Sequence, residues 1–146
     1  IDENGEKKLP YIIHRTSLGC YERTLAYLLE TYAGALPTWM APEQVRLLPV
    51  TDRAVDYCRE QAAKLTNMGF RVTVDDRSEK IGKKIRDGQM EKVPYMLIVG
   101  QKEEEEHKVS MRSRYDGDAG SMELSAFIDQ VCREIRTKEI RKAKEE

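Results

Sequence analysis

The spacing of hydrophobic and polar positions changes along the chain, and after residue 44 it is typical of an α/β fold. Apolar runs at residues 45–50, 70–74 and 93–99, with an alternating run at 108–114, predict strands. The intervening segments carry an apolar residue at every third or fourth position, which predicts helices. Strands that alternate with helices favour a three-layer α/β/α domain. We expect a mixed, mainly parallel sheet of about five strands, with three helices.

The three expected helices each have an apolar stripe and an expected boundary. The first follows Thr51 as its N-cap and ends near Gly69, and the second spans about residues 80–91. The third begins at Ser121 as its N-cap and carries apolar residues from Leu124 to Ile135. Residues 93–99 are apolar throughout, as expected of the central strand, and residues 101–106 are expected to form a solvated acidic loop.

The first 43 residues have a different pattern. An Asn4-Gly5 turn and the apolar run 11–13 predict a strand pair, and residues 21–32 predict a helix. Pro37 and Pro42 interrupt any helix that would follow. We therefore expect residues 1–36 to be the remnant of a separate domain, residues 37–43 to be a linker and residues 44–146 to be the α/β domain. Because the chain begins with Ile1, we expect it to be a piece of a longer protein.

Composition and charge narrow the class of protein. The chain has 146 residues, of which 40% are hydrophobic and 35% charged, and its net charge of -1 gives no long-range attraction to nucleic acid. Its three cysteines are scattered and odd in number, so we expect neither a disulfide framework nor a metal knuckle. No signal peptide or membrane span is visible in the sequence, and we expect a cytoplasmic protein with no membrane contact.

Any nucleic-acid site must therefore come from a local cluster of cations. An isolated basic run such as residues 80–86 is most often a solvated helix face. The predicted topology, however, brings basic residues from separate segments to one edge of the sheet. There they can pair with phosphates, and Tyr115 can stack on an unpaired base, which favours single-stranded RNA as the ligand. The converging residues are Arg77, Lys80, Arg86, Arg112 and Arg114.

The chain has few residues for chemistry of its own. His14, His107 and the cysteines do not have the spacing of a zinc site. The acidic run 103–106 is best explained as solvated carboxylates, and the sequence has neither a Gly-rich phosphate loop nor a Ser, His and Asp set. We expect the chain alone to be non-catalytic and to hold no cofactor.

Five segments occur in the order and spacing of one known family. They are residues 13–23 (IHRTSLGCYER), 37–45 (PTWMAPEQV), 76–86 (DRSEKIGKKIR), 93–100 (VPYMLIVG) and 118–122 (DAGSM). Together they resemble the C-terminal part of the threonyl-tRNA synthetases, which are class II aminoacyl-tRNA synthetases. The resemblance implies that residues 44–146 form an anticodon-binding domain and that the tRNA specific for threonine is the partner.

The first segment is similar to the third signature motif of class II synthetases. The resemblance implies that Arg23 lies against the adenine of ATP. It also implies that His14 is the third ligand of a zinc ion that holds the amino group and hydroxyl of threonine. Cys20 stands where the family commonly has a small residue, often serine, beside the amino-acid pocket. The intact family members are homodimers that use ATP and Mg²⁺ to form threonyl-adenylate and pass threonine to its tRNA.

The same resemblance implies which residues contact the anticodon. Ser78 stands where the family often has asparagine, and Arg86 is the residue expected to contribute most. The implied base contacts and the basic residues beside them are Ser78, Arg86, Glu103 and Arg112, with Arg77 and Lys80.

Two alternatives remain open. One is an anticodon-binding module of a prolyl, glycyl or histidyl synthetase or of a non-catalytic accessory protein, against which His14 and Arg23 argue. The other is a flavodoxin-like signalling or ligand-binding domain. That domain would need an acidic cluster or a phosphate loop at its strand ends, rather than Arg86 and Arg112.

Overall fold

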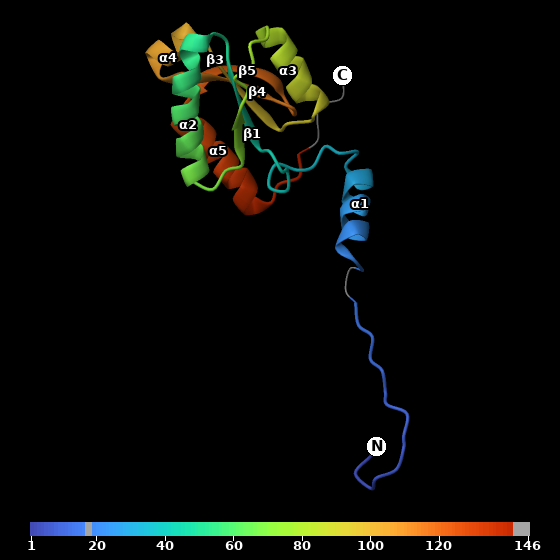
Figure 1. Ribbon diagram of the computed structural model, residues 1–146. Helices are drawn as coiled ribbons and strands as arrows, with labels where there is room; N and C mark the ends of the chain where they lie inside the picture. Colours follow the sequence, from blue (N-terminus) through green and yellow to red (C-terminus); the bar gives the residue numbers. More distant parts are fainter. Residues whose placement is uncertain (17–18, 142–146) are drawn as a thin grey trace.

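A five-stranded sheet in the order β2-β1-β3-β4-β5 organises the C-terminal two thirds of the chain (Figure 1). In this computed structural model, which describes residues 1–16 and 19–141, β1 (Val45–Pro49) lies parallel to β2 (Val72–Val74) and β3 (Tyr95–Val99). β4 (Lys108–Ser113) and β5 (Gly117–Glu123) add antiparallel pairings. The predicted mixed sheet of five strands is confirmed, with β3 in the middle as expected.

Helices cover the two faces of the sheet differently (Figure 1). α2 (Val55–Asn67), which follows the short helix η1 (Asp52–Ala54), and α5 (Leu124–Thr137) pack on the face that holds the main core. α3 (Ile81–Met90) covers the other face over β1 and β3. The expected three layers are therefore confirmed. The core side chains include Val45, Leu47, Cys58, Leu65, Leu97, Val99, Val109, Phe127 and Val131.

The segment before α5 is a strand, which corrects the prediction that Ser121 caps the last helix. Ser121 lies within the register of β5, and Glu123 is the N-cap residue of α5. Gly117 and Gly120 both have φ of +77°, and the pairing of β5 with β4 is irregular near its middle. The side chains of β5 are small or polar and show no alternation that would predict a strand. Its backbone hydrogen bonds to β4 hold it in the sheet.

The acidic residues 101–106 form the short helix α4 (Gln101–Glu106) rather than the expected loop. The carboxylate of Glu103 accepts a hydrogen bond from the N–H of Gly100 at 3.0 Å and thereby closes the first turn. The acidic side chains in that turn also stabilise the helix, because they interact favourably with the positive end of its dipole. Thr51, the other expected cap, precedes η1 but makes no capping hydrogen bond with its side chain.

Residues 1–16 do not form the expected strand pair and extend away from the sheet (Figure 1). The turn at Gly5 is present, but Ile12 and Ile13 are 86% and 89% exposed, because no second apolar surface lies beside them to bury them. α1 (Tyr21–Thr31) forms where predicted and has no buried residue. None of the described helices is long and apolar enough to cross a membrane.

Arg114 fastens the segment before the sheet to the domain. Its guanidinium donates hydrogen bonds to the carbonyl oxygens of Leu36, at 2.8 Å, and Lys92, and to the hydroxyl of Tyr115 at 3.0 Å. Tyr115 is only 3% exposed, and its hydroxyl also bonds that of Thr38 at 3.1 Å. Arg114 and Tyr115 are therefore engaged within the fold and have fewer free polar groups for RNA than the sequence interpretation assumed.

Two contacts seat α3 on the sheet. A Cβ atom at Gly88 would lie 2.6 Å from the sulfur of Met96 in β3, so the helix backbone approaches the sheet closely at this point. Near the same end of the helix, the buried Arg46 of β1 bonds the carboxylates of Glu43 and Glu91. The position of α3 therefore depends on the absence of a side chain at Gly88 and on ion pairs of the buried Arg46 with two more exposed carboxylates.

Replacing Gly88 by alanine should lower the free energy of unfolding by about 1–2 kcal/mol, because the buried Met96 must move to admit the new methyl group. Gly82→Ala is the matched control in the same helix, since a Cβ there meets nothing within 4 Å. That control should stabilise by roughly 0.5–1 kcal/mol through helix propensity. Urea unfolding of both variants measures the two changes in the free energy of unfolding. Equal changes would contradict the close approach of α3 to the sheet at Gly88.

Replacing Arg114 by alanine should lower the free energy of unfolding by about 1–3 kcal/mol, because two carbonyl groups lose their donor. Proteolysis between residues 33 and 42 should also accelerate as the segment loosens. Arg86→Ala is the control, because Arg86 is exposed and should change stability by less than about 0.5 kcal/mol. Thermal unfolding and limited proteolysis check both statements, and an Arg114 variant as stable as the control would overturn them.

Candidate nucleic-acid interface

Two cavities lie at opposite ends of α3 and share no lining residue among those described. The first, about 450 Å³, lies beyond the carboxyl ends of β1 and β2, beside Ser78 and Lys80. The second, about 440 Å³, lies beside β4 and is lined by Gln89 and Arg112. A ten-residue helix separates them by about 15 Å. The predicted contact residues therefore follow α3 rather than converge at one edge of the sheet, which corrects the expected single cluster.

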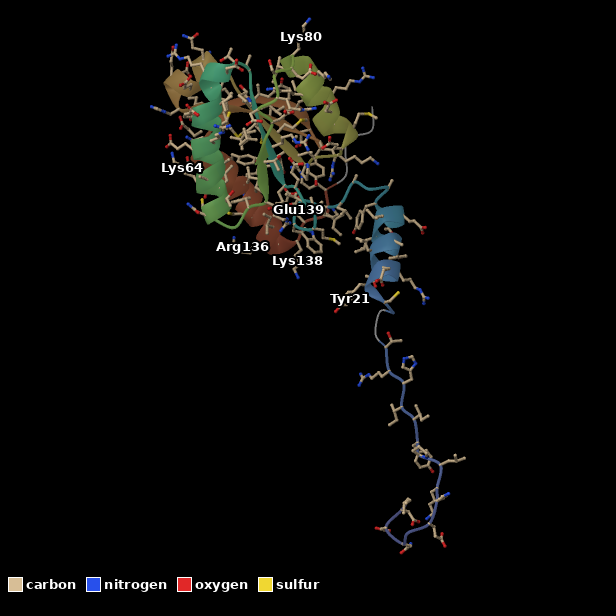
Figure 2. The ribbon with its side chains drawn as sticks, viewed as in Figure 1. Tyr21, Lys64, Lys80, Arg136, Lys138 and Glu139 are labelled. Carbon is tan, nitrogen blue, oxygen red and sulfur yellow. The ribbon has the colours of Figure 1, made fainter. Side chains whose placement is uncertain are left out.

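Lys80 and Arg86 are the cations of this region best placed to meet a ligand. Both are exposed, and their side chains form no hydrogen bond or ion pair with any other residue in the described part of the chain. Lys80 is the N-cap residue of α3 and lies at the outer end of the helix (Figure 2). Arg86 lies one turn before Gln89, which lines the second cavity, on the exposed side of α3.

Arg77, by contrast, is held by two carboxylates. Its Nε lies 2.8 Å from Oδ1 of Asp75, and its Nη2 lies 2.7 Å from Oδ2 of Asp75 and 3.0 Å from Oδ2 of Asp87. The hydrogen bonds from Arg77 lower the pKa of the Asp75 carboxyl, although partial burial opposes this shift. Arg77 therefore holds the loop before α3 and has less of its charge available to RNA than the sequence interpretation assumed.

Arg112 has an unsatisfied donor in the second cavity. It lies opposite Met96 in the register of β3 and β4, on the face of the sheet that α3 covers only in part. Its Nε is buried and has no hydrogen-bond partner among the described residues. A buried donor without an acceptor costs free energy, so an acceptor from a ligand would be favoured here.

Glu103 combines a structural contact with a half-buried position over the face of β4 that carries Arg112. Its Oε1 accepts a hydrogen bond from the hydroxyl of Ser110 at 2.8 Å, and Ser110 and Arg112 share one face of β4. Burial raises the pKa of the Glu103 carboxyl, but hydrogen bonds from Ser110 and from the backbone outweigh it and lower the pKa. This part of the surface thus has a carboxylate that contacts Ser110 and, two residues further along β4, the guanidinium of Arg112.

His14, Cys20 and Arg23 lie on the N-terminal segment, away from these cavities. All three are exposed, and Cys20 is the N-cap residue of α1. Among residues 1–16 and 19–141, no group of three or more His, Cys, Asp or Glu side chains is close enough to hold a metal ion. Within these residues His14 therefore has too few neighbouring donors to complete a zinc site.

Lys84 is a residue at the site that the sequence interpretation did not single out. It is 4% exposed, and its ammonium donates hydrogen bonds to the carbonyl oxygens of Asp75 at 2.9 Å and Pro49 at 3.2 Å. The helical spacing could have predicted that Lys84 is buried, because it falls in the same stripe as Ile81, Ile85 and the buried Gly88.

Comparisons with known proteins match this geometry to one family. A family model for the anticodon binding domain matches residues 44–134. The threonine–tRNA ligase of Clostridium botulinum (strain Eklund 17B) is 54% identical over 139 residues, which are 95% of this chain and 22% of that protein. The corresponding ligase of Clostridioides difficile is 49% identical over the same shares of the two chains. This chain therefore spans about a fifth of the length of these relatives.

Two solved structures share the fold. The RNA binding domain of threonyl-tRNA synthetase from Cryptosporidium parvum is 31% identical with a TM-score of 0.71, over 77% of this chain and 28% of that chain. The prolyl-tRNA synthetase from the same organism, solved with halofuginone and AMPPNP, is 25% identical with a TM-score of 0.59, over 70% and 22% of the two chains. The match over residues 44–134, together with the sheet and its helices, shows that this chain belongs to the anticodon-binding domain family.

Proposed function

We propose that this chain binds the anticodon loop of the tRNA specific for threonine, as part of a longer threonine–tRNA ligase. The observation that carries the proposal is the match of residues 44–134 to the anticodon-binding family, together with 54% identity to a threonine–tRNA ligase. The side chains of Lys80, Arg86 and Arg112 along α3 and β4 support it, because they pair with no other side chain of the described residues and provide the local cations that the net charge of -1 does not.

The proposed contact residues suit different parts of the RNA. Lys80 and Arg86 are exposed and suit phosphates, which position the RNA without reading its sequence. The guanidinium of Arg112 and the carboxylate of Glu103 suit the donor and acceptor groups of unpaired bases, because both are partly withdrawn from water. Ser78, exposed beside the first cavity, adds a hydroxyl that can donate or accept.

The remaining assignments concern the longer protein. We infer that residues 1–36 belong to a catalytic domain, residues 37–43 to a linker and residues 44–146 to the anticodon-binding domain. In that protein Arg23 would stack on ATP, Cys20 would lie near the amino-acid pocket, and His14 would be one of several zinc ligands. The exposed apolar residues Tyr11, Ile12 and Ile13 support this inference, because isolated in water they have no partner surface. Threonine activation with Mg²⁺ and ATP, a homodimer and a cytoplasmic location belong to the same proposal.

A module of another class II synthetase is the second candidate, because the fold is shared with a prolyl-tRNA synthetase. The base sequence of the preferred RNA separates the two candidates. A flavodoxin-like domain has less support, since β4 and β5 run antiparallel to their neighbours and no cluster of acidic ligands is present in the described residues.

The 146-residue chain should bind the anticodon stem-loop of threonine-specific tRNA at least about tenfold more tightly than a copy with changed anticodon bases, since each base contact is worth about 1–3 kcal/mol. Fluorescence anisotropy at about 50 and 200 mM salt separates phosphate contacts from base contacts, because only the former weaken strongly with salt. Equal affinity for both RNAs would leave only a general RNA surface, and preference for a proline anticodon would favour the second candidate.

Replacing Arg86 by alanine should weaken binding of threonine-specific tRNA by roughly 1–3 kcal/mol, the scale of one charge-assisted contact between a guanidinium and a phosphate. Arg136→Ala is the matched control, because it removes the same charge from an exposed residue of α5, far from Lys80 in the molecule (Figure 2). Isothermal titration of both variants measures the difference. Unchanged affinity in the Arg86 variant would remove this residue from the interface.

A further inference from the structure

Lys84 ties together both ends of the loop that connects β2 to α3, residues 75–80. Its ammonium donates to the carbonyl of Asp75 at 2.9 Å, where the loop begins, and its backbone makes the ordinary helical hydrogen bond to the carbonyl of Lys80 at 3.2 Å, where the loop ends, so the side chain joins the start of the loop to the first turn of α3. The same ammonium reaches Pro49 at the end of β1. One residue therefore connects α3, the loop and two neighbouring strands.

The surroundings of Lys84 make this connection rigid. Burial of an ammonium group is unfavourable unless hydrogen bonds replace its water, so the two carbonyl contacts are strongly held in the folded state. Within the loop, Arg77 bonds the carboxylates of Asp75 and Asp87. The N–H of Asp75 also donates to the carbonyl oxygen of Leu47 in β1 at 2.9 Å. The loop is thus fixed from within the sheet and from α3, although Ser78 and Lys80 at its surface remain exposed.

We propose that Lys84 is a positioning residue for RNA recognition, which fixes residues 75–80 so that Ser78 and Lys80 meet the RNA without first being ordered. The proposal rests on the anticodon-binding function proposed above. Lys84 does not itself contact RNA, because it is 4% exposed and its ammonium is engaged by two carbonyl groups. A preordered loop strengthens binding, since the RNA does not have to offset the conformational entropy of the loop.

The free protein provides the first test. In Lys84→Met, hydrogen exchange of the backbone amides of residues 76–80 should accelerate about tenfold, while exchange in α2 stays unchanged. Lys83→Met is the matched control, since it removes a neighbouring charge whose exposed ion pair with Glu79 is worth little, and it should accelerate exchange less than about twofold. Equal exchange in the two variants would overturn the proposal.

A double-mutant cycle with the anticodon stem-loop provides the second test. Lys84→Met should weaken binding about five- to tenfold, the scale of one net hydrogen bond, and leave the salt dependence unchanged because no phosphate contact is lost. Lys80→Met should weaken binding in the native background but by less than about twofold in the Lys84→Met background. Independent, multiplicative effects would show that Lys84 does not act through the loop.

Two further measurements keep the outcomes distinct. If Lys84→Met does not fold, as judged by circular dichroism, Lys84→Gln retains one donor group and takes its place in both tests. If the native chain binds no RNA, the proposed function fails, and the exchange experiment alone then decides whether Lys84 fixes the loop. Accelerated exchange without any change in RNA affinity would also reject the role in recognition.

Discussion

The close contact between α3 and the sheet determines where this molecule can act. Gly88 lets the helix approach Met96 at one end, and the buried ammonium of Lys84 joins the first turn to the ends of β1 and β2. Because α3 covers β1 and β3, it leaves the same face of β4 and β5 partly open. The candidate interface is the boundary between the covered and open parts of that face, so a shift of α3 would change both cavities together.

The cations of the domain divide into two groups by their partners. Arg46, Arg77 and Arg114 bond carboxylates or backbone carbonyls, and these contacts hold β1, the loop before α3 and the segment before the sheet in place. Lys80, Arg86 and Arg112 have no such partners among the described residues. A chain with a net charge of -1 can therefore still offer phosphate and base contacts, because some of its cations are paired within the fold while others in the same region remain available.

Elements with a strong side-chain period were predictable, whereas those held mainly by backbone or capping contacts were not. The apolar run at 93–99 and the stripe through Cys58 and Leu65 placed β3 and α2. β5 was missed because its glycines and polar residues carry no alternation and its pairing with β4 supplies the strand. α4 was missed because a run of carboxylates predicts a solvated loop. The helix depends on the hydrogen bond between Glu103 and the backbone of Gly100, which the sequence pattern does not indicate. The pair of strands expected before residue 16 lacked a surface on which to pack.

The sequence by itself determined the alternation of strands and helices, the residue types along α3 and the resemblance to an aminoacyl-tRNA synthetase family, because these depend only on order and spacing. The tertiary structure decided which charged residues are available. Arg77 and Arg86 are both arginines in one short segment, yet only the fold brings Asp75 and Asp87 around the first and leaves the second exposed. Likewise Lys84 differs from Lys83 only in helical phase, but the phase decides that one ammonium is buried against strand ends while the other remains in water.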